Sequence, residues 1–340
     1  MSPKHRLLSA FALAVATTVA TPKAGAVAWA KPTVIVFDVH GDVGGTQPLA
    51  INGKGRIAGT WTDSNKISHG FVRNPDGSIV SFDPKASVET LAYGINDNDV
   101  ITGFFSDGSV QHGFLRKHGG NIVVFDPSGA KATSPYCINN NGAIAGSWTD
   151  SSSVSHGFVR APNGTITSFD PADSTNTGAE AINGAGDIAG LYYDSTYVGH
   201  GFVRLAYGTI VTFDPTGSVF TDAAGINYRG AVAGFYKDKS QAQHGFLRAP
   251  DGTITTFDAP GATYGTYVVA IDNHDVITGF YINANGASVG YLRKADGTIR
   301  NLYVPKAREG VYPSSVIDPG TITGSFQDRN FKYRGFLRTP

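Results

Sequence analysis

A histidine in a repeated hexad is the most prominent group that could do chemistry. The hexad reads Ser-His-Gly-Phe-Val-Arg at 68–73 and returns with small changes at 111–116, 155–160, 199–204 and 243–248. Imidazole near neutral pH can transfer protons or bind metals. A catalytic group is needed once, whereas these five histidines share nearly the same local sequence. We therefore interpret them as structural. A metal ring is the less favoured alternative, because each copy offers one His and one Asp, while structural zinc sites converge four ligands.

An upstream segment supplies a carboxylate partner for each histidine. Successive strand residues face opposite sides, and folding residues 57–63 against 67–73 as a hairpin places Asp63 opposite His69 and Trp61 opposite Phe71. A nearby carboxylate favours the protonated imidazole. The predicted structural pairs are Asp63–His69, Asp107–His112, Asp150–His156, Asp194–His200 and Asp238–His244.

Two further copies of the segment lack the histidine and test this interpretation. The sixth copy has Val289, and its partner position holds the uncharged Asn283. The seventh has Arg334 and keeps the carboxylate Asp328. The carboxylate is thus kept where the opposite residue is a cation and lost where it is not, as expected of a cross-strand pair.

These segments belong to a repeat of about 44 residues that runs through the chain. Each repeat holds four short alternating segments, here called a to d, separated by turns rich in Asn, Asp and Gly. Four antiparallel strands at this period form one blade of a β-propeller. The predicted fold is all-β, a seven-bladed β-propeller with four antiparallel strands per blade. The expected blades span 46–84, 89–127, 133–171, 177–215, 221–260, 266–305 and 312–338, the last together with 33–39.

The two ends of the repeat array complement each other. The seventh repeat lacks its d segment, and an isolated d-like segment, Thr-Val-Ile-Val-Phe-Asp, stands at 33–38 before the first a segment. We expect this N-terminal strand to close the last blade, which hides two open sheet edges. A linear solenoid is the alternative, and it leaves both partial ends unexplained. Residues 31–340 are thus expected to form one domain.

The repeat consensus, Gly-Ile-Asn, then Ile-Ala-Gly, His-Gly-Phe-x-Arg, Asp-Gly-x-Ile and Phe-Asp, resembles the extracellular HAF-repeat family. That family is named for a His-Ala-Phe tripeptide, which is His-Gly-Phe here, and the resemblance covers residues 33–340. It implies a secreted β-propeller and assigns no activity.

The N-terminal residues read as a secretory signal peptide over 1–30. A basic start precedes an apolar run at 7–20, which is too short for a membrane span, and Ala-x-Ala cleavage sites end near Ala30. We therefore expect secretion, extracellular or periplasmic, and no membrane span. The single cysteine, Cys137, excludes an internal disulfide.

Charge and motifs exclude several classes of function. The chain has 27 basic and 27 acidic residues without a basic stripe, which argues against nucleic acid as a partner. It carries no phosphate-binding, zinc-protease or calcium-loop motif. We therefore expect no cofactor and no metal.

Function is expected where the copies differ. If the d segment is outermost, segment a lines the central channel, and the d–a and b–c loops share the face that usually carries binding sites. Counted back from the Ile that ends segment a, positions −4 and −2 vary strongly, ending with Pro313 and Ser315 in the seventh copy. A freely varying solvated rim is the plain alternative. The candidate ligand-binding residues are Gln47, Tyr93, Tyr136, Glu180, Asp222 and Tyr267.

Three functions remain open at this stage. The favoured one is a secreted binding or scaffold protein for a glycan, a small polar ligand or a cell-surface protein. The second is a carbohydrate-active lyase or hydrolase, with Tyr136, Glu180 and His40 as catalytic candidates or with Glu180 and Asp222 as a carboxylate pair. The third is a structural envelope protein without a specific ligand.

Overall fold

The computed structural model describes residues 32–340, and the regular structure in this range consists of β-strands. The predicted signal peptide, residues 1–30, lies outside the described residues. Between residues 32 and 340 no helix has the length and apolarity to cross a membrane. Antiparallel pairing groups the strands in fours, as in β2 with β3, β3 with β4 and β4 with β5.

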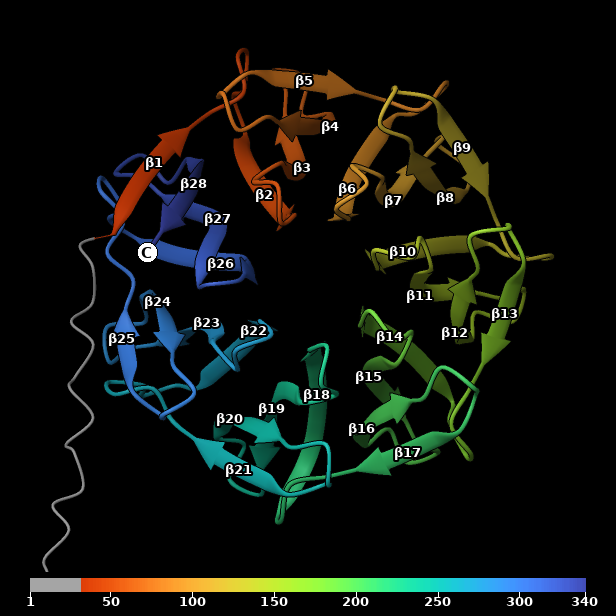
Figure 1. Cartoon of the computed structure of the whole chain (residues 1–340), viewed down its shortest axis with the longest axis vertical. Helices are drawn as coiled ribbons and strands as arrows, with labels where there is room; N and C mark the ends of the chain where they lie inside the picture. Colours follow the sequence, from red (N-terminus) through yellow and green to blue (C-terminus); the bar gives the residue numbers. More distant parts are fainter. Residues whose placement is uncertain (1–31) are drawn as a thin grey trace, which may run out of the picture. The chain divides into compact units, whose positions relative to one another are not determined.

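The four strands of each group, here called a unit, keep the letters a to d from the central axis outward (Figure 1). Strand a is β2 (Gly45–Ile51), β6 (Glu89–Ile95), β10 (Ala132–Ile138), β14 (Asn176–Ile182), β18 (Ser218–Ile226), β22 (Thr266–Ile271) and β26 (Gly310–Ile317). Strand b is β3 (Ile57–Thr62), β7 (Ile101–Ser106), β11 (Ile144–Thr149), β15 (Ile188–Tyr193), β19 (Val232–Asp238), β23 (Ile277–Ile282) and β27 (Thr321–Gln327). Strand c is β4 (Ser68–Arg73), β8 (Gln111–Arg116), β12 (Ser155–Arg160), β16 (Gly199–Arg204), β20 (Gln243–Arg248), β24 (Ser288–Arg293) and β28 (Tyr333–Thr339). Strand d is β5 (Ile79–Phe82), β9 (Ile122–Phe125), β13 (Ile166–Phe169), β17 (Ile210–Phe213), β21 (Ile254–Phe257), β25 (Ile299–Asn301) and β1 (Thr33–Phe37).

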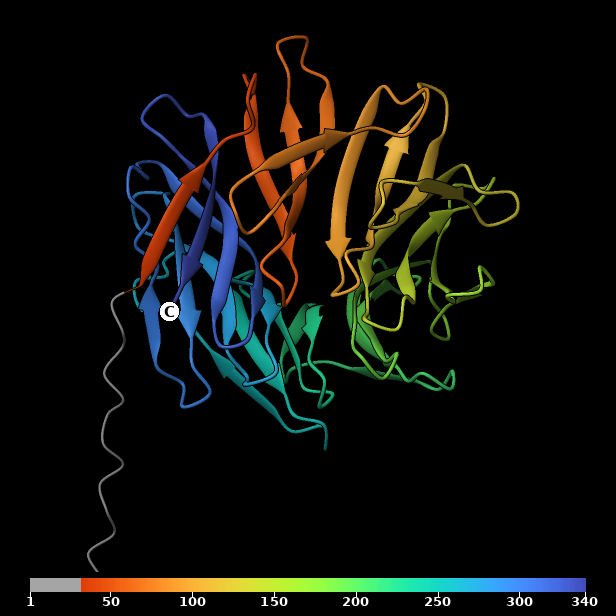
Figure 2. The ribbon, with the colours of Figure 1, turned by 45° about the horizontal axis from the view of Figure 1, so that its top comes forward.

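The units follow one another around a ring, and the ends of the array lie side by side in it (Figures 1 and 2). β1 pairs antiparallel with β28 over Thr33–Phe37, so the N-terminal strand is the outer strand beside the C-terminal one. Single parallel bridges between strand c of one unit and strand a of the next merge units into sheets of twelve, eight and eight strands. The outer edge of β28 is therefore covered, as expected for an edge that would otherwise invite aggregation.

The Phe and Arg of the hexad pack against the neighbouring unit and stabilise the junction. Phe202 is fully buried and meets the Phe169 ring of the preceding unit edge-on, with centroids 5.9 Å apart. The Arg204 guanidinium lies over the same Phe169 ring at 4.9 Å from its centroid. Such a cation–aromatic contact contributes about 0.5–1 kcal/mol, and burial of each Phe about 1.5–3 kcal/mol. The same pair of contacts recurs at Phe71/Arg73, Phe114/Arg116, Phe158/Arg160, Phe246/Arg248 and Tyr291/Arg293.

A β-bulge in strand a shapes the channel wall. In β6 the pairing with β7 shifts between Ala92 and Gly94, which leaves Tyr93 as the extra residue. Equivalent shifts make Tyr136 and Glu180 the extra residues of β10 and β14. A bulge bends its strand and re-aims the extra side chain. The glycine of strand b opposite this region is required, because a Cβ on Gly103 would lie 2.0 Å from the Leu91 carbonyl oxygen.

The a–b turns are tied together around the axis by asparagines. The amide nitrogen of Asn52 donates to the main-chain carbonyl of Asn96 at 2.9 Å, and Asn96 donates in the same way to Asn139 at 3.0 Å. The pattern continues through Asn139, Asn183 and Asn227. We call these five residues the asparagine ring. It surrounds a cavity of about 350 Å³ at the a–b end of the channel.

Candidate functional site

The hexad histidines lie at the start of strand c, but their register differs from the predicted one. Trp61, not Asp63, is the cross-strand partner of His69, and Gly59 lies opposite Phe71. The predicted strand register is therefore wrong by two residues in every unit that carries the His, although the five predicted Asp–His ion pairs are present. The physical reason is the tight b–c turn, in which Asp63 closes the turn and its Oδ1 accepts hydrogen bonds from Asn65 N and Ile67 N.

Each predicted aspartate still stands near its histidine, as a secondary contact. His69 Nε2 is 3.6 Å from Asp63 Oδ2, and the separation is 3.5 or 3.6 Å in the other four pairs. The imidazole also lies against the strand b aromatic ring, with centroids 4.8 Å apart for Trp61 and His69. The predicted aromatic pairs, such as Trp61 with Phe71, are corrected accordingly: the strand b ring packs on His, and Phe71 packs between units.

The closest partner of each histidine is the aspartate that ends strand d, which the sequence analysis did not pair with it. His112 Nδ1 lies 2.7 Å from Asp126 Oδ2, and Thr133 of the next unit donates to Asp126 Oδ1 at 2.5 Å. We call this set the His–Asp–Thr network. The strand d partners of the other histidines are Asp83, Asp170, Asp214 and Asp258, at 2.7 to 2.9 Å.

The His–Asp–Thr network explains the Phe-Asp of the repeat as a link between units. Its electrostatics favour the charged imidazole: the hydrogen bond with Asp126 raises the pKa of His112 against the opposing effect of burial. For His200, burial lowers the pKa, and the bonds and charges of Asp214 and Asp194 outweigh it, so that the net shift is upward. In the seventh unit Arg334 takes the same place and binds both Asp328 and Asp38. Five similar His–Asp pairs, four of them extended by the Thr, and one permanently charged substitute fit a structural role.

The variable strand a positions gather at the other end of the channel, flanked by the b–c turns and d–a loops. The Tyr93 and Tyr136 rings of neighbouring units meet edge-on, with centroids 5.5 Å apart. Tyr136 and Glu180 then share a pocket of about 390 Å³, whose wall also includes Asn176, Tyr193 and Tyr197. The structure therefore brings Tyr93, Tyr136 and Glu180 together.

Two largely buried acids from adjacent units lie close to each other: Glu180, which lines the pocket, and Asp222, which lies beside it. Burial raises the pKa of Glu180. Burial, with the nearby charge of Glu180, raises the pKa of Asp222 to about 7. In the part of the chain that the structure describes, Asp222 Oδ1 is buried without a hydrogen-bond partner. A half-protonated carboxyl at neutral pH can donate to or accept from a polar ligand.

Aromatic residues continue the wall through the fifth, sixth and seventh units. Tyr267 stacks on Phe280 of strand b, with centroids 4.6 Å apart and planes 8° apart. Phe280 in turn meets Tyr312 of the next unit at 5.7 Å. We call the connected series the aromatic arc, which consists of Tyr193, Phe220, Phe235, Tyr267, Phe280, Tyr312 and Tyr333.

Sequence reasoning missed the strand b members of this wall. Phe104, Phe235 and Phe280 lie opposite Leu91, Asp222 and Tyr267 on the same face. The signal was present, since the residue after the Ile-Ala-Gly triplet varies among copies as strongly as position −4 does. The seventh copy was also misaligned by one residue, because Val316, not Ile317, pairs with Ile322 there.

The remaining candidates lie apart from this pocket. In the seventh unit the channel residues are Tyr312 and Ser314, not the predicted Pro313 and Ser315. Gln47 is exposed in β2, and His40 is exposed in the β1–β2 loop, where it is not part of the pocket wall formed by Tyr136 and Glu180. Cys137 is a free thiol whose pKa is raised by burial, which fits a small packed residue.

Comparison with known proteins identifies the architecture. No family model matches the chain, and no curated protein matches it. Among solved structures, a streptogramin B lyase superposes with a TM-score of 0.61 at 14% identity, covering 90% of this chain and 98% of the lyase. The β-propeller domain of the Trilobed protease from Pyrococcus furiosus gives 0.58 at 7% identity, covering 86% and 92%. This chain has a β-propeller fold.

Further propeller structures agree on the fold at low identity. Virginiamycin B lyase from Staphylococcus aureus gives a TM-score of 0.59 at 15% identity, covering 91% of this chain and the whole of the lyase. At such identities the likeness concerns the fold, and function has to be argued from this chain's own residues.

Proposed function

We propose that this protein is a seven-bladed β-propeller that binds a glycan or another polar ligand at the b–c end of its channel. The observation that carries the proposal is the convergence of Tyr93, Tyr136 and Glu180 from three adjacent units, beside Asp222. The blade count rests on the seven strands a and on the pairing of β1 with β28, which supplies the fourth strand of the last blade.

The chemistry of this wall suits a sugar ring. Aromatic faces pack against the apolar face of a pyranose, and carboxylates and amides accept hydrogen bonds from its hydroxyls. Tyr136 and Tyr193 supply rings, Glu180 supplies an acid and Asn176 an amide around one pocket. A scaffold built from repeated His–Asp–Thr networks leaves these unrepeated positions free to specify the ligand.

A glycan array followed by titration of the best ligand tests the proposal. We expect Tyr136→Ala to weaken binding at least tenfold, which equals about 1.4 kcal/mol, and Glu180→Gln to weaken it as well. Tyr207→Ala is the matched control, because Tyr207 is 80% exposed in a c–d turn. Binding that is equal in all three variants, or no binding to any polar ligand tried, would refute the proposal and favour a purely structural envelope protein.

A carbohydrate-active enzyme is the second candidate, favoured by one observation. The pKa of Asp222 is raised to about 7 beside Glu180, and a carboxyl of that kind can act as a general acid near neutral pH. A reducing-end assay and absorbance of unsaturated products on secreted polysaccharides test it. Turnover that Asp222→Asn abolishes, without loss of ligand binding, would establish this function over simple binding.

We further propose that the protein belongs to the HAF-repeat family and is secreted after cleavage near Ala30. The repeat consensus over residues 33–340 and the apolar run at 7–20 support this. N-terminal sequencing of protein from the culture fluid and periplasm tests it, and the expected first residue is Lys31. Full-length protein retained in the cytoplasm would contradict the proposal.

A further inference from the structure

The asparagine ring at the a–b end of the channel is interrupted in the sixth unit. Five turns have Asn at the first position after strand a, and the sixth has Asp272. Asp272 keeps half of the asparagine's role, because its Oδ1 accepts hydrogen bonds from His274 N and Val276 N, both at 2.9 Å. Asn227 uses its Oδ1 in the same way for Arg229 N and Ala231 N.

The second hydrogen bond of each asparagine, in which its side chain donates, has no counterpart at Asp272. Each asparagine directs its Nδ2 donor to the main-chain carbonyl of the next unit, at 2.9 to 3.2 Å. Asp272 has an acceptor, Oδ2, in place of that donor. Ile317 is the corresponding residue of the seventh unit, since its carbonyl accepts from Gly320 N as that of Asn52 does from Gly55 N.

Asp272 Oδ2 is buried without a hydrogen-bond partner among residues 32–340, and the residue is only 4% exposed. A buried carboxylate oxygen without a partner is costly, because nothing replaces the water it loses. A positive charge placed against Oδ2 would remove this cost.

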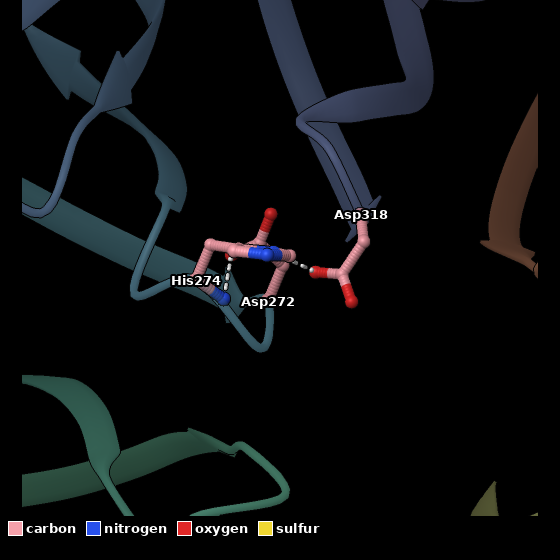
Figure 3. Close-up of side chains that lie close together, drawn as sticks. All are labelled: Asp272, His274 and Asp318. Atoms are coloured by element: carbon pink, nitrogen blue, oxygen red, sulfur yellow. Dashed lines mark hydrogen bonds and ion pairs between the residues drawn. The ribbon is translucent and has the colours of Figure 1, made fainter.

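Two further ligand-type side chains, His274 and Asp318, lie beside Asp272 (Figure 3). His274 Nδ1 lies 3.0 Å from Asp318 Oδ1, and single ligand atoms of Asp272, His274 and Asp318 all lie within 4.8 Å of one another. Asp318 also accepts from Asn273 N and Nδ2, at 3.0 and 3.1 Å, which fixes its carboxylate. Among residues 32–340 this is the group of His, Cys, Asp or Glu side chains that approaches metal-binding geometry.

We propose that Asp272, His274 and Asp318 bind a divalent first-row cation of the zinc type. Two carboxylate oxygens and one imidazole nitrogen suit such an ion better than calcium, which takes oxygen ligands. The ligand bonds would be about 2.0–2.2 Å long, so the three atoms close by a small movement of the exposed His274 and Asp318 side chains. A fourth position remains open to water.

The site joins the sixth and seventh units, whose junction has neither the His–Asp–Thr network nor its Arg334 substitute, which binds Asp38 and Asp328 in the seventh unit. Between units six and seven, the network positions are occupied by Val289, Tyr303 and Val311, which cannot form it. The five junctions from the first to the sixth unit each have both the His and the strand d Asp. A cation between Asp272 and Asp318 would therefore tie the junction that lacks the other link.

Calorimetric titration of the untagged, chelator-treated full chain with Zn²⁺ tests the proposal. We expect one site, a rise in melting temperature with Zn²⁺, and binding at least tenfold weaker in Asp272→Asn. This variant restores the asparagine of the other units, so it should melt at or above the metal-free wild type. His118→Ala is the matched control: His118 is similarly exposed and beside Asp99, and its loss should leave Zn²⁺ binding within twofold.

Cobalt substitution adds a readout of the ligands themselves. Co²⁺ should give visible absorption bands that His274→Gln changes. Zn²⁺ binding by Asp272→Asn within twofold of wild type would overturn the proposal. A wild type that does not bind at 1 mM Zn²⁺, while Asp272→Asn is more stable, would also overturn it, because a proton would then occupy the place assigned to the cation.

Discussion

The two aspartates beside each histidine should differ in their energetic coupling to it. In the second unit, Asp126→Asn and Asp107→Asn can each be combined with His112→Ala in a double-mutant cycle. His112 Nδ1 lies 2.7 Å from Asp126, a typical hydrogen-bond length, whereas Nε2 lies 3.5 Å from Asp107, a much weaker contact. Asn at 107 keeps the oxygen that closes the b–c turn through Ser109 N and Val110 N.

The expected coupling follows from geometry and exposure. A hydrogen bond between charged groups contributes about 1.5–3 kcal/mol when it is sheltered. His112 and Asp126 side chains are 24% and 29% exposed, so solvent screening reduces this to about 1 kcal/mol. The coupling with Asp107 should be clearly smaller, because that contact is longer, at 3.5 Å, and the carboxylate is exposed.

Urea unfolding at pH 5.5, where the imidazole is charged, measures both couplings against the same His112→Ala variant. A parallel cycle at pH 8.5 serves as a control, because the coupling with Asp126 should decrease as His112 loses its proton. Equal couplings for the two aspartates, or a larger one for Asp107, would refute the assignment of the strand d aspartate as the main partner.

Three further outcomes are expected. Phe158→Ala should cost about 3–5 kcal/mol in urea unfolding, since the ring is fully buried between units, whereas Tyr207→Ala should cost almost nothing; similar losses would contradict the packing. The melting temperature should decline as pH rises from about 6.5, because the raised pKa values of His112, His156 and His200 stabilise the fold only while the imidazoles are protonated; a flat profile to pH 9 would argue against charged networks. Glu180→Gln should lower the pKa of Asp222, followed by NMR titration, yet leave it above its usual range because burial is the larger cause; an unchanged Asp222 pKa would show that the two acids are not coupled.

Most of the fold could be predicted from the repeat, because its period and its turn residues indicate the order of the strands directly. The register in which neighbouring strands pair was harder to predict. The b–c turn closes on Asp63 through backbone hydrogen bonds, and no residue pattern showed that the strand ends at Thr62. The pairing therefore slipped by two residues, which keeps side chains on the correct face and so preserves the periodicity that was used to predict it.

The variation among the strand a residues indicated which residues to consider as a candidate site. It did not predict their geometry. The β-bulge that makes Tyr136 and Glu180 extra residues leaves no mark in the sequence. The raised pKa of Asp222 also depends on burial and on a neighbouring unit. Phe104 and Phe280 were missed because strand b was examined for what repeats. A comparison of copies position by position on both inner strands would have found them.

The exceptions to the repeat show which residues act as a set. Where the histidine is replaced by Val289, the strand d aspartate is replaced by Tyr303 and the next threonine by Val311. All three members are absent at this junction, as expected if a strand d aspartate left without its histidine costs more than the pair contributes. Where Arg334 replaces the histidine, both carboxylates remain, since its charge still needs them. The same reasoning applies to Asp272, an exception whose buried oxygen has no partner within the described chain. No described protein group compensates the change from Asn to Asp at position 272. We therefore propose that a bound cation supplies the positive charge that Oδ2 lacks.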